Sequence, residues 1–310
     1  MPNAEASQTR LAIIAESVIG TIPATPTWQT LRYVSEGLKY AKQTAVSDEI
    51  RGDGNVTDIS DVGRSVSGPL AFELSYGTYD LMLESLFRGA WTTNVLKNGF
   101  THKSVALEKT FEQGATDSFI RYRGVEVDTM DLQIESRQII KGSFGLRGIA
   151  SPAPTTSIIT GATYAAASST PVMNASAHVG ALSMSGVTDQ PKCKTVNLQV
   201  RSNLYENDAI GDKDIDSLGM GRFEVSGNLV AYFRSLDVYN AMQAHGDVGL
   251  TLGLGSISGS KYTLALPRMK LLDGTPLVEG RDRSVMIDVP FQAIYDGSSA
   301  ATATLTRAVA

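Results

Sequence analysis

Histidine and cysteine are the side chains that most often carry nucleophilic, acid–base or metal chemistry, and this sequence has few of them. Its histidines are His102, His178 and His245, and its one cysteine is Cys193. None of the four stands at a metal-ligand spacing from another, and the sequence contains no nucleophile elbow, Walker loop or zinc signature. We therefore predict no catalytic, cofactor-binding or metal-binding residue, and a protein that is not an enzyme.

One acidic run imitates a calcium loop. Asp212, Asp214 and Asp216 occupy the first, third and fifth positions that such a loop uses. The sixth position, which needs glycine, is Ser217, and the twelfth, which needs a bidentate glutamate, is Phe223. These departures favour a solvated acidic loop over a calcium site.

Two further signals indicate binding only weakly. The run 253–255, Gly-Leu-Gly, is a fragment of a dinucleotide fingerprint without its third glycine, and it is more typical of a flexible turn. Trp28 and Trp91 could form a platform for a sugar, although tryptophan more often packs in a core or an interface. A non-catalytic carbohydrate-binding β-sandwich module therefore remains the alternative function.

Length and charge narrow the class of protein. The 310 residues are enough for about two domains, each with its own core. The formal net charge is −5, with both signs interspersed along the chain, which argues against a basic face that grips nucleic acid or anionic lipid. Near the N-terminus the apolar run 11–14 is too short for a signal peptide or a membrane span. We expect no membrane partner.

A short sequence occurs twice. Val66-Ser67-Gly68-Pro69-Leu70 returns as Val225-Ser226-Gly227-Asn228-Leu229, and each copy continues into a strand-like stretch and then a short amphipathic helix. Long Gly/Asp-rich loops precede both copies, and extended pairs of strands follow them. The pattern predicts an internal duplication.

The helix ends support the same repeat. Asp80 and Asp237 are suitable N-cap residues, because a carboxylate can accept the first backbone N–H groups of a helix. Gly89 and Gly246 follow at the same distance and suit the left-handed position after the last turn. The fold class predicted is mainly β, with two duplicated β-sandwich or barrel-like domains, each with one flanking α-helix.

The predicted domains are residues 1–150, with an N-terminal arm, and residues 191–310. Between them, residues 151–190 are rich in Ala, Ser and Pro, which is typical of a linker that leads into an edge strand. A connection of this length favours an arm that packs on a neighbouring chain.

The order of these motifs resembles the tail tube (major tail) proteins of long-tailed bacteriophages. In the first half the resemblance lies in 31–39 (LRYVSEGLK), 47–51 (SDEIR), 66–68 (VSG) and 73–80 (ELSYGTYD). In the second half it lies in Asn203-Leu204, Ile210-Gly211, Gly219, Val225-Ser226-Gly227 and Tyr232-Phe233.

This resemblance implies a structural subunit of the virion tail, made in the host cytoplasm, whose rings stack into a tube for DNA ejection. Its partners would be itself, the tape measure protein, and the tail tip and terminator proteins, while DNA passes through the lumen without specific binding. Two domains per chain favour a homotrimer ring of pseudo-six-fold symmetry over a hexamer.

Two sets of residues follow as candidates for these roles. The loops from Ser47 to Arg64 and from Asn207 to Arg222 are expected to reach the adjacent ring. A lumen that lets DNA slide is expected to be net negative, because basic groups would hold phosphate. The ring-stacking candidates are Asp48, Arg51, Asp53, Asp58, Asp61, Asp212, Asp214 and Asp216, and the lumen candidates are Glu73, Glu126, Asp128 and Asp131.

Overall fold

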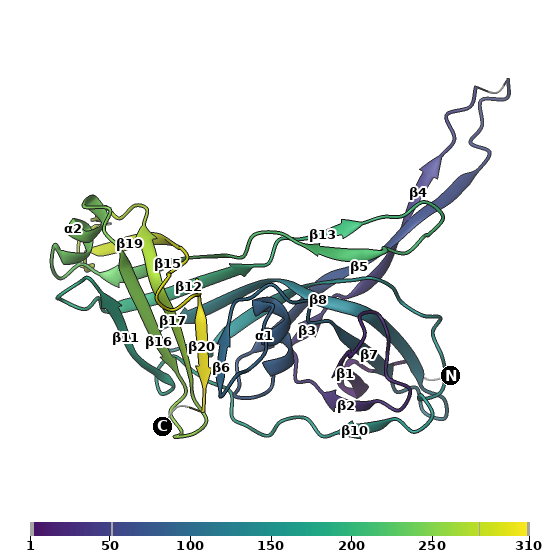
Figure 1. Ribbon diagram of the computed structural model, residues 1–310, viewed down its shortest axis with the longest axis horizontal. Helices are drawn as coiled ribbons and strands as arrows, with labels where there is room; N and C mark the ends of the chain where they lie inside the picture. Colours follow the sequence, from purple (N-terminus) through teal and green to yellow (C-terminus); the bar gives the residue numbers. More distant parts are fainter. Residues whose placement is uncertain (1–2, 51, 279, 309–310) are drawn as a thin grey trace.

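Antiparallel strands dominate the computed structural model, which describes residues 3–50, 52–278 and 280–308 (Figure 1). Eight of them form one continuous run in which each strand is antiparallel to the next. In order they are β4 (Lys39–Val46), β5 (Ile59–Glu73), β9 (Lys141–Gly148), β8 (Ser118–Glu135), β12 (Cys193–Arg201), β15 (Glu224–Tyr232), β19 (Met286–Ala293) and β18 (Pro276–Leu277). We call this run the main sheet. The short β3 (Ser35–Glu36) continues the line of β4 along β5.

Side chains along the main sheet alternate between a core face and an exposed face. On β8, Met130, Leu132 and Ile134 are buried, while Asp131 and Gln133 between them are exposed. This period of two is what a strand with one solvated face requires. The apolar face is covered by two further layers of strands and by a helix.

The layer over the first half consists of β10 (Thr163–Ala165), β2 (Thr27–Thr30), β1 (Thr9–Ala15), β7 (Val105–Phe111) and the start of β8. The 3-10 helix Ala6–Gln8 leads into β1. Strand β8 passes from this layer to the main sheet, because residues 118–125 pair with β7 and residues 126–133 with β9. The result is the predicted β-sandwich.

The layer over the second half is built around β17 (Tyr262–Leu271). One side of β17 pairs with β16 (Val248–Leu254), which pairs in turn with β11 (Val179–Ser185). The start of β17 also pairs with β20 (Thr304–Arg307), which pairs with β6 (Val95–Lys97) of the first half. The C-terminal strand therefore joins the two halves.

Both predicted helices exist, as α1 (Asp80–Phe87) and α2 (Asp237–Gln243), but their predicted caps are wrong by one residue. The Asp80 carboxylate accepts a hydrogen bond from the Tyr262 hydroxyl rather than from the first turn, and Asp237 accepts one from the backbone N–H of Asp189. The left-handed residues are Arg88 (φ 53°) and His245 (φ 49°).

Gly89 is needed for space rather than for backbone conformation. A Cβ on Gly89 would lie 2.5 Å from the carbonyl oxygen of Lys97, whereas one on Gly246 would meet no atom within 4 Å.

The order of pairing is the same in the two halves of the chain. Strands β5, β9, β8 and β7 are successive neighbours in the first half, and β15, β19, β17 and β16 are successive neighbours in the second. The long hairpin β4–β5 also has a counterpart, because β13 (Leu204–Asn207) and β14 (Ser217–Met220) form a hairpin between β12 and β15. Internal duplication remains a prediction, which this shared order supports.

One hydrophobic cluster extends through both halves, and the β8–β12 ladder joins them. The predicted boundaries at 150 and 190 remain predictions. The segment between them contributes β10 and β11 and lies along its own chain: Arg121 donates to the Ser157 carbonyl (3.0 Å), and the backbone N–H of Ile140 donates to the Met173 carbonyl (3.0 Å).

Candidate functional site

The β4–β5 hairpin is the most prominent surface feature, because it reaches away from the body of the molecule (Figure 1). We call it the arm. Its connecting residues carry exposed apolar side chains, Ile50 and Val56, between acidic ones. The predicted loop from Ser47 to Arg64 is too long, since Ile59–Arg64 belongs to β5. Likewise, residues 217–220 of the second predicted loop form β14.

The two predicted loops contact each other. The backbone N–H of Arg64 donates to the Lys213 carbonyl (2.7 Å), and Lys213 Nζ lies 3.3 Å from Asp61 Oδ2. The Tyr40 hydroxyl donates to Asp214 Oδ1. The β13–β14 hairpin therefore braces the base of the arm, which sequence reasoning missed because residues 61 and 213 are far apart in the chain.

The stacking candidates thus fall into separate groups. Asp61 and Asp214 belong to the brace, and the guanidinium of Arg64 lowers the pKa of Asp61. Arg51 lies outside the described residues. The remaining candidates lie in the connecting loops of the two hairpins: Asp48, Asp53 and Asp58 on the arm, and Asp212 and Asp216 on the β13–β14 hairpin.

The second candidate surface is the exposed face of the main sheet. A shallow hollow at its centre is lined by polar side chains from β8, β9 and β12, among them Asp131, Lys141 and Gln199. Cross-strand pairing sets Asp131 opposite both Ser143 and Gln199. Among the outward positions that the ladders of the main sheet pair, acidic residues outnumber basic ones: Glu73, Asp131, Glu135, Glu224 and Asp288 against Lys39, Lys141, Arg147 and Arg201.

The lumen candidates do not all share this face. Glu73 and Asp131 do. Asp128 lies at a β-bulge between Val127 and Thr129, where it binds Arg147 Nε (2.8 Å) and accepts the Leu204 backbone N–H (2.7 Å). Glu126 is only 1% exposed, so its burial removes it from the set of candidates for a channel wall.

Glu126 instead belongs to a buried polar cluster at the end of α1. Its Oε1 lies 2.9 Å from His102 Nδ1, and the Arg88 guanidinium donates to the carbonyls of Ser202 (3.1 Å) and Gly221 (2.8 Å). Burial raises the pKa of Glu126, against the opposing charges of His102 and Arg88. The cluster ties α1 to the hairpin that follows β12.

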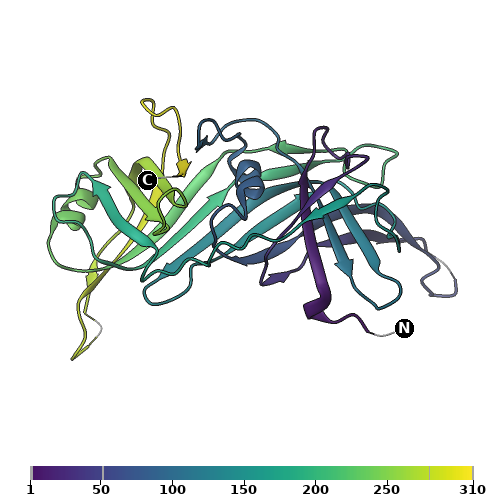
Figure 2. The same cartoon turned by 90° about the horizontal axis from the view of Figure 1, so that it is seen from below.

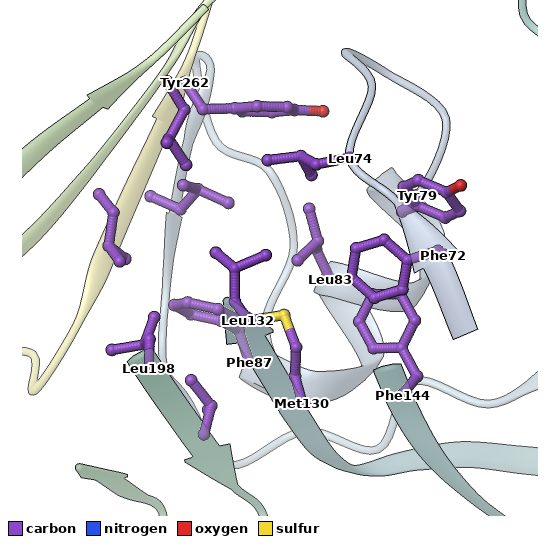
Figure 3. Close-up of a pocket in the computed structure, with 14 residues that line it drawn as sticks. Phe72, Leu74, Tyr79, Leu83, Phe87, Met130, Leu132, Phe144, Leu198 and Tyr262 are labelled. Carbon is purple, nitrogen blue, oxygen red and sulfur yellow. The ribbon is translucent and has the colours of Figure 1, made fainter. Parts of the chain in front are cut away.

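An apolar cavity of about 40 Å³ lies between the two halves (Figure 3). Phe72, Phe144 and Leu83 from the first half line it together with Leu198 and Tyr262 from the second. The Tyr262 hydroxyl is occupied by Asp80 (2.6 Å) and by the Gly77 N–H (2.8 Å). With an apolar lining and a small volume, the cavity is a packing gap rather than a ligand site.

The two tryptophans do not form a sugar platform. Trp28 is fully buried, in a small cluster with Ala12 and Ala106. Trp91 is half-buried, with the Arg307 guanidinium 4.5 Å from its ring centre and the Tyr262 ring 6.4 Å away. The carbohydrate-binding alternative therefore loses the residues that suggested it.

The described residues hold neither a cluster of metal ligands nor a helix that could span a membrane. No three His, Cys, Asp or Glu side chains in this part of the chain are grouped so that they could hold a metal ion. In the same residues no helix has both the length and the apolar character needed to cross a membrane.

A projecting arm and a broad polar sheet face, with its sheet open at both edges, are features of a structural protein that assembles with copies of itself. Comparison with known proteins agrees: a family model described as phage tail tube protein matches residues 6–293. The chain belongs to the phage tail tube protein family, so it is a structural component of the virion tail that self-assembles into a tube. None of the curated proteins matches the chain.

Proposed function

We propose that this chain is a ring-forming subunit whose rings stack into a hollow tube, through which the genome passes into the host. It performs no catalysis. The observation that carries the proposal is the main sheet: one face is packed on the core, the other is polar and uncovered, and both edge strands have a neighbour on one side only among the described strands.

Each ring contains three chains. The two halves have the same order of paired strands, so each can occupy one of six similar positions around a ring. A trimer of this kind has pseudo-six-fold symmetry.

The exposed face of the main sheet lines the channel. Each phosphate that a Lys or Arg neutralises releases counterions and strengthens DNA binding, so a basic wall would retain the genome. The paired outward positions of the main sheet carry more acidic than basic side chains, which suits a wall that DNA must slide along.

The arm joins successive rings. It extends beyond the body of the subunit, and its exposed Ile50 and Val56 would be buried against a ring above or below. The tape measure protein, and the tail tip and terminator proteins, are the further partners we propose.

Negative-stain microscopy of the purified chain tests this function. We expect rings or tubes with a central channel, alone or on addition of a tail tip assembly. A protein that stays monomeric at high concentration under both conditions would contradict the proposal.

A further inference from the structure

The two halves of the chain are joined on two layers. In the main sheet, which crosses both halves (Figure 2), β12 pairs with β8 from Thr195 to Arg201. The contacts of Arg88 with Ser202 and Gly221 lie at the end of β12, so they belong to this first joint. In the other layer, β20 lies between β17 and β6 and is antiparallel to both (Figure 1). A joint on one layer can rock like a hinge, whereas a second joint on another layer fixes the angle.

Strand β20 is an internal strand of its layer, although it is the last of the described strands. Leu305 pairs with Leu264 of β17 on one side and with Leu96 of β6 on the other, and all three side chains are buried. Leu305 also lines the apolar cavity between the halves. Removing β20 would therefore leave two strand edges unpaired and open a groove shaped for an extended segment.

The loop before β20 is anchored to the first half. Asn98 Oδ1 accepts hydrogen bonds from the backbone N–H groups of Thr302 (2.7 Å) and Ala303 (3.1 Å). Lys97 Nζ donates to the Ser299 carbonyl (2.7 Å). These bonds hold the start of β20 beside β6, so a strand released at its far end would stay near its groove.

The far end of β20 is held through Arg307. Its guanidinium donates to Asp80 and lies 4.5 Å from the ring centre of Trp91, and its backbone N–H donates to the Asn94 carbonyl (2.8 Å). Asp80 also accepts a hydrogen bond from the Tyr262 hydroxyl (2.6 Å), and Tyr262 pairs with Arg307 in the β17–β20 ladder. Arg307 therefore contacts both halves at one point.

The family match ends at residue 293, and β20 begins at Thr304. Membership of the family therefore does not account for this strand or for its position between the halves.

We propose that β20 is a clasp that fixes the angle between the two halves, and that only a clasped chain closes a ring. In a ring of three chains with six similar positions, the turn between the halves of one chain must equal the turn from one chain to the next. A chain with an open clasp keeps the β8–β12 joint and rocks about it. This inference rests on the proposed ring and names the element that sets the shape of its subunit.

Leu305→Asp tests the clasp, because a carboxylate does not remain buried between two leucines and should expel β20 from its groove. Spin labels at Glu112→Cys in the first half and Ala244→Cys in the second, both exposed, report the distance between the halves in a Cys193→Ser background. We expect a normal circular dichroism spectrum, a broader distance distribution than without Leu305→Asp, and no rings by negative-stain microscopy.

Three results would contradict the clasp. A Leu305→Asp chain that unfolds as a whole would show that β20 is part of an indivisible core. One that stays folded and forms normal rings would show that ring closure does not depend on β20. Lost rings with an unchanged distance distribution would show that β20 does not fix the angle. The absence of rings in the wild type would instead contradict the proposed function, whereas a broader distribution in Leu305→Asp would still show that β20 fixes the angle.

A milder variant makes the clasp switchable in the same background. Arg307→Glu places a negative charge beside Asp80, and Val95→Cys with Thr306→Cys, at positions paired across β6 and β20, adds a disulfide that holds the strand in place. If about nine-tenths of the reduced chains are open, ring formation should need about tenfold more protein, and oxidation should restore the wild-type concentration. Analytical ultracentrifugation measures this concentration.

Arg268→Glu is the charge-matched control, because it breaks an ion pair on β17 (2.8 Å) outside the residues that pair with β20. It should form rings at the wild-type concentration. Equal ring formation by the reduced and oxidised forms of the Arg307→Glu chain would overturn the proposal.

Discussion

Single side chains hold the junction between α1 and the second half. Arg88 is buried and left-handed, and it donates to two backbone carbonyls across the junction.

Glu126 shows why burial could not be predicted from alternation alone. The β-bulge between Val127 and Thr129 changes which residues face the core: Val125 and Val127 do so before it, and Met130 and Leu132 after it. Asp131, after the bulge, follows the simple alternation.

Arg88→Ala should lower the free energy of unfolding by about 2–4 kcal/mol, because it leaves the carbonyls of Ser202 and Gly221 without their charged donor. Arg88→Gly should be more stable than Arg88→Ala by about 1 kcal/mol, because only glycine adopts φ near 53° without strain. Urea unfolding of both variants measures the difference. Equal stability of the two would contradict the role of the left-handed backbone.

Glu126→Gln should gain stability relative to the wild type as pH rises. Burial raises the folded-state pKa of Glu126 above its ordinary value of 4.5, so its contribution to stability is present below that value and is lost as pH rises through the folded-state pKa. The difference should grow by at most about 1.4 kcal/mol for each unit of pKa shift. Urea unfolding between pH 4 and pH 8 measures it.

Gln133→Ala is the control, because it replaces a side chain on the exposed sheet face that does not titrate. Its difference from the wild type in the free energy of unfolding should not vary with pH. A constant difference for Glu126→Gln as well would show that this carboxyl titrates alike in the folded and unfolded protein.

At the scale of elements, local sequence patterns predicted the strands and helices that depend only on residues close together in the chain. The strand-like stretch and the short amphipathic helix expected at each Val-Ser-Gly copy are present, as β5 with α1 and as β15 with α2. Contacts between distant segments were not predictable in this way. The brace of Asp61 and Lys213 and the ladder of β20 with β6 each join parts of the chain that no sequence pattern links.

The arm gives a prediction at this scale. Replacing residues 47–58 by an Asn-Gly turn should leave a folded subunit, because the brace at Arg64 and Lys213 lies below the deletion. The variant should form rings that do not elongate. Circular dichroism checks the fold and microscopy measures tube length. Ile158→Ser, at an exposed apolar residue outside the arm, is the control. Tubes of normal length after the deletion would refute the stacking role.

At the scale of the whole molecule, the proposed function depends on which surface faces the channel. Asp131→Lys adds a positive charge at the centre of the exposed sheet face, so its tubes should retain DNA, and retention should fall steeply as salt rises. Glu112→Lys, at an exposed residue after β7, is the charge-matched control and should retain none. DNA filter binding across a salt series measures this. Equal retention by both variants would show that Asp131 does not face the channel.

A reconstruction of assembled tubes by electron cryomicroscopy tests the whole account most directly. It should show three 33.0 kDa chains in each ring. The exposed face of the main sheet, including Asp131, should be turned to the channel. Asp and Glu should outnumber Lys and Arg on the channel wall. Six chains in each ring, or a wall on which Lys and Arg outnumber Asp and Glu, would contradict it.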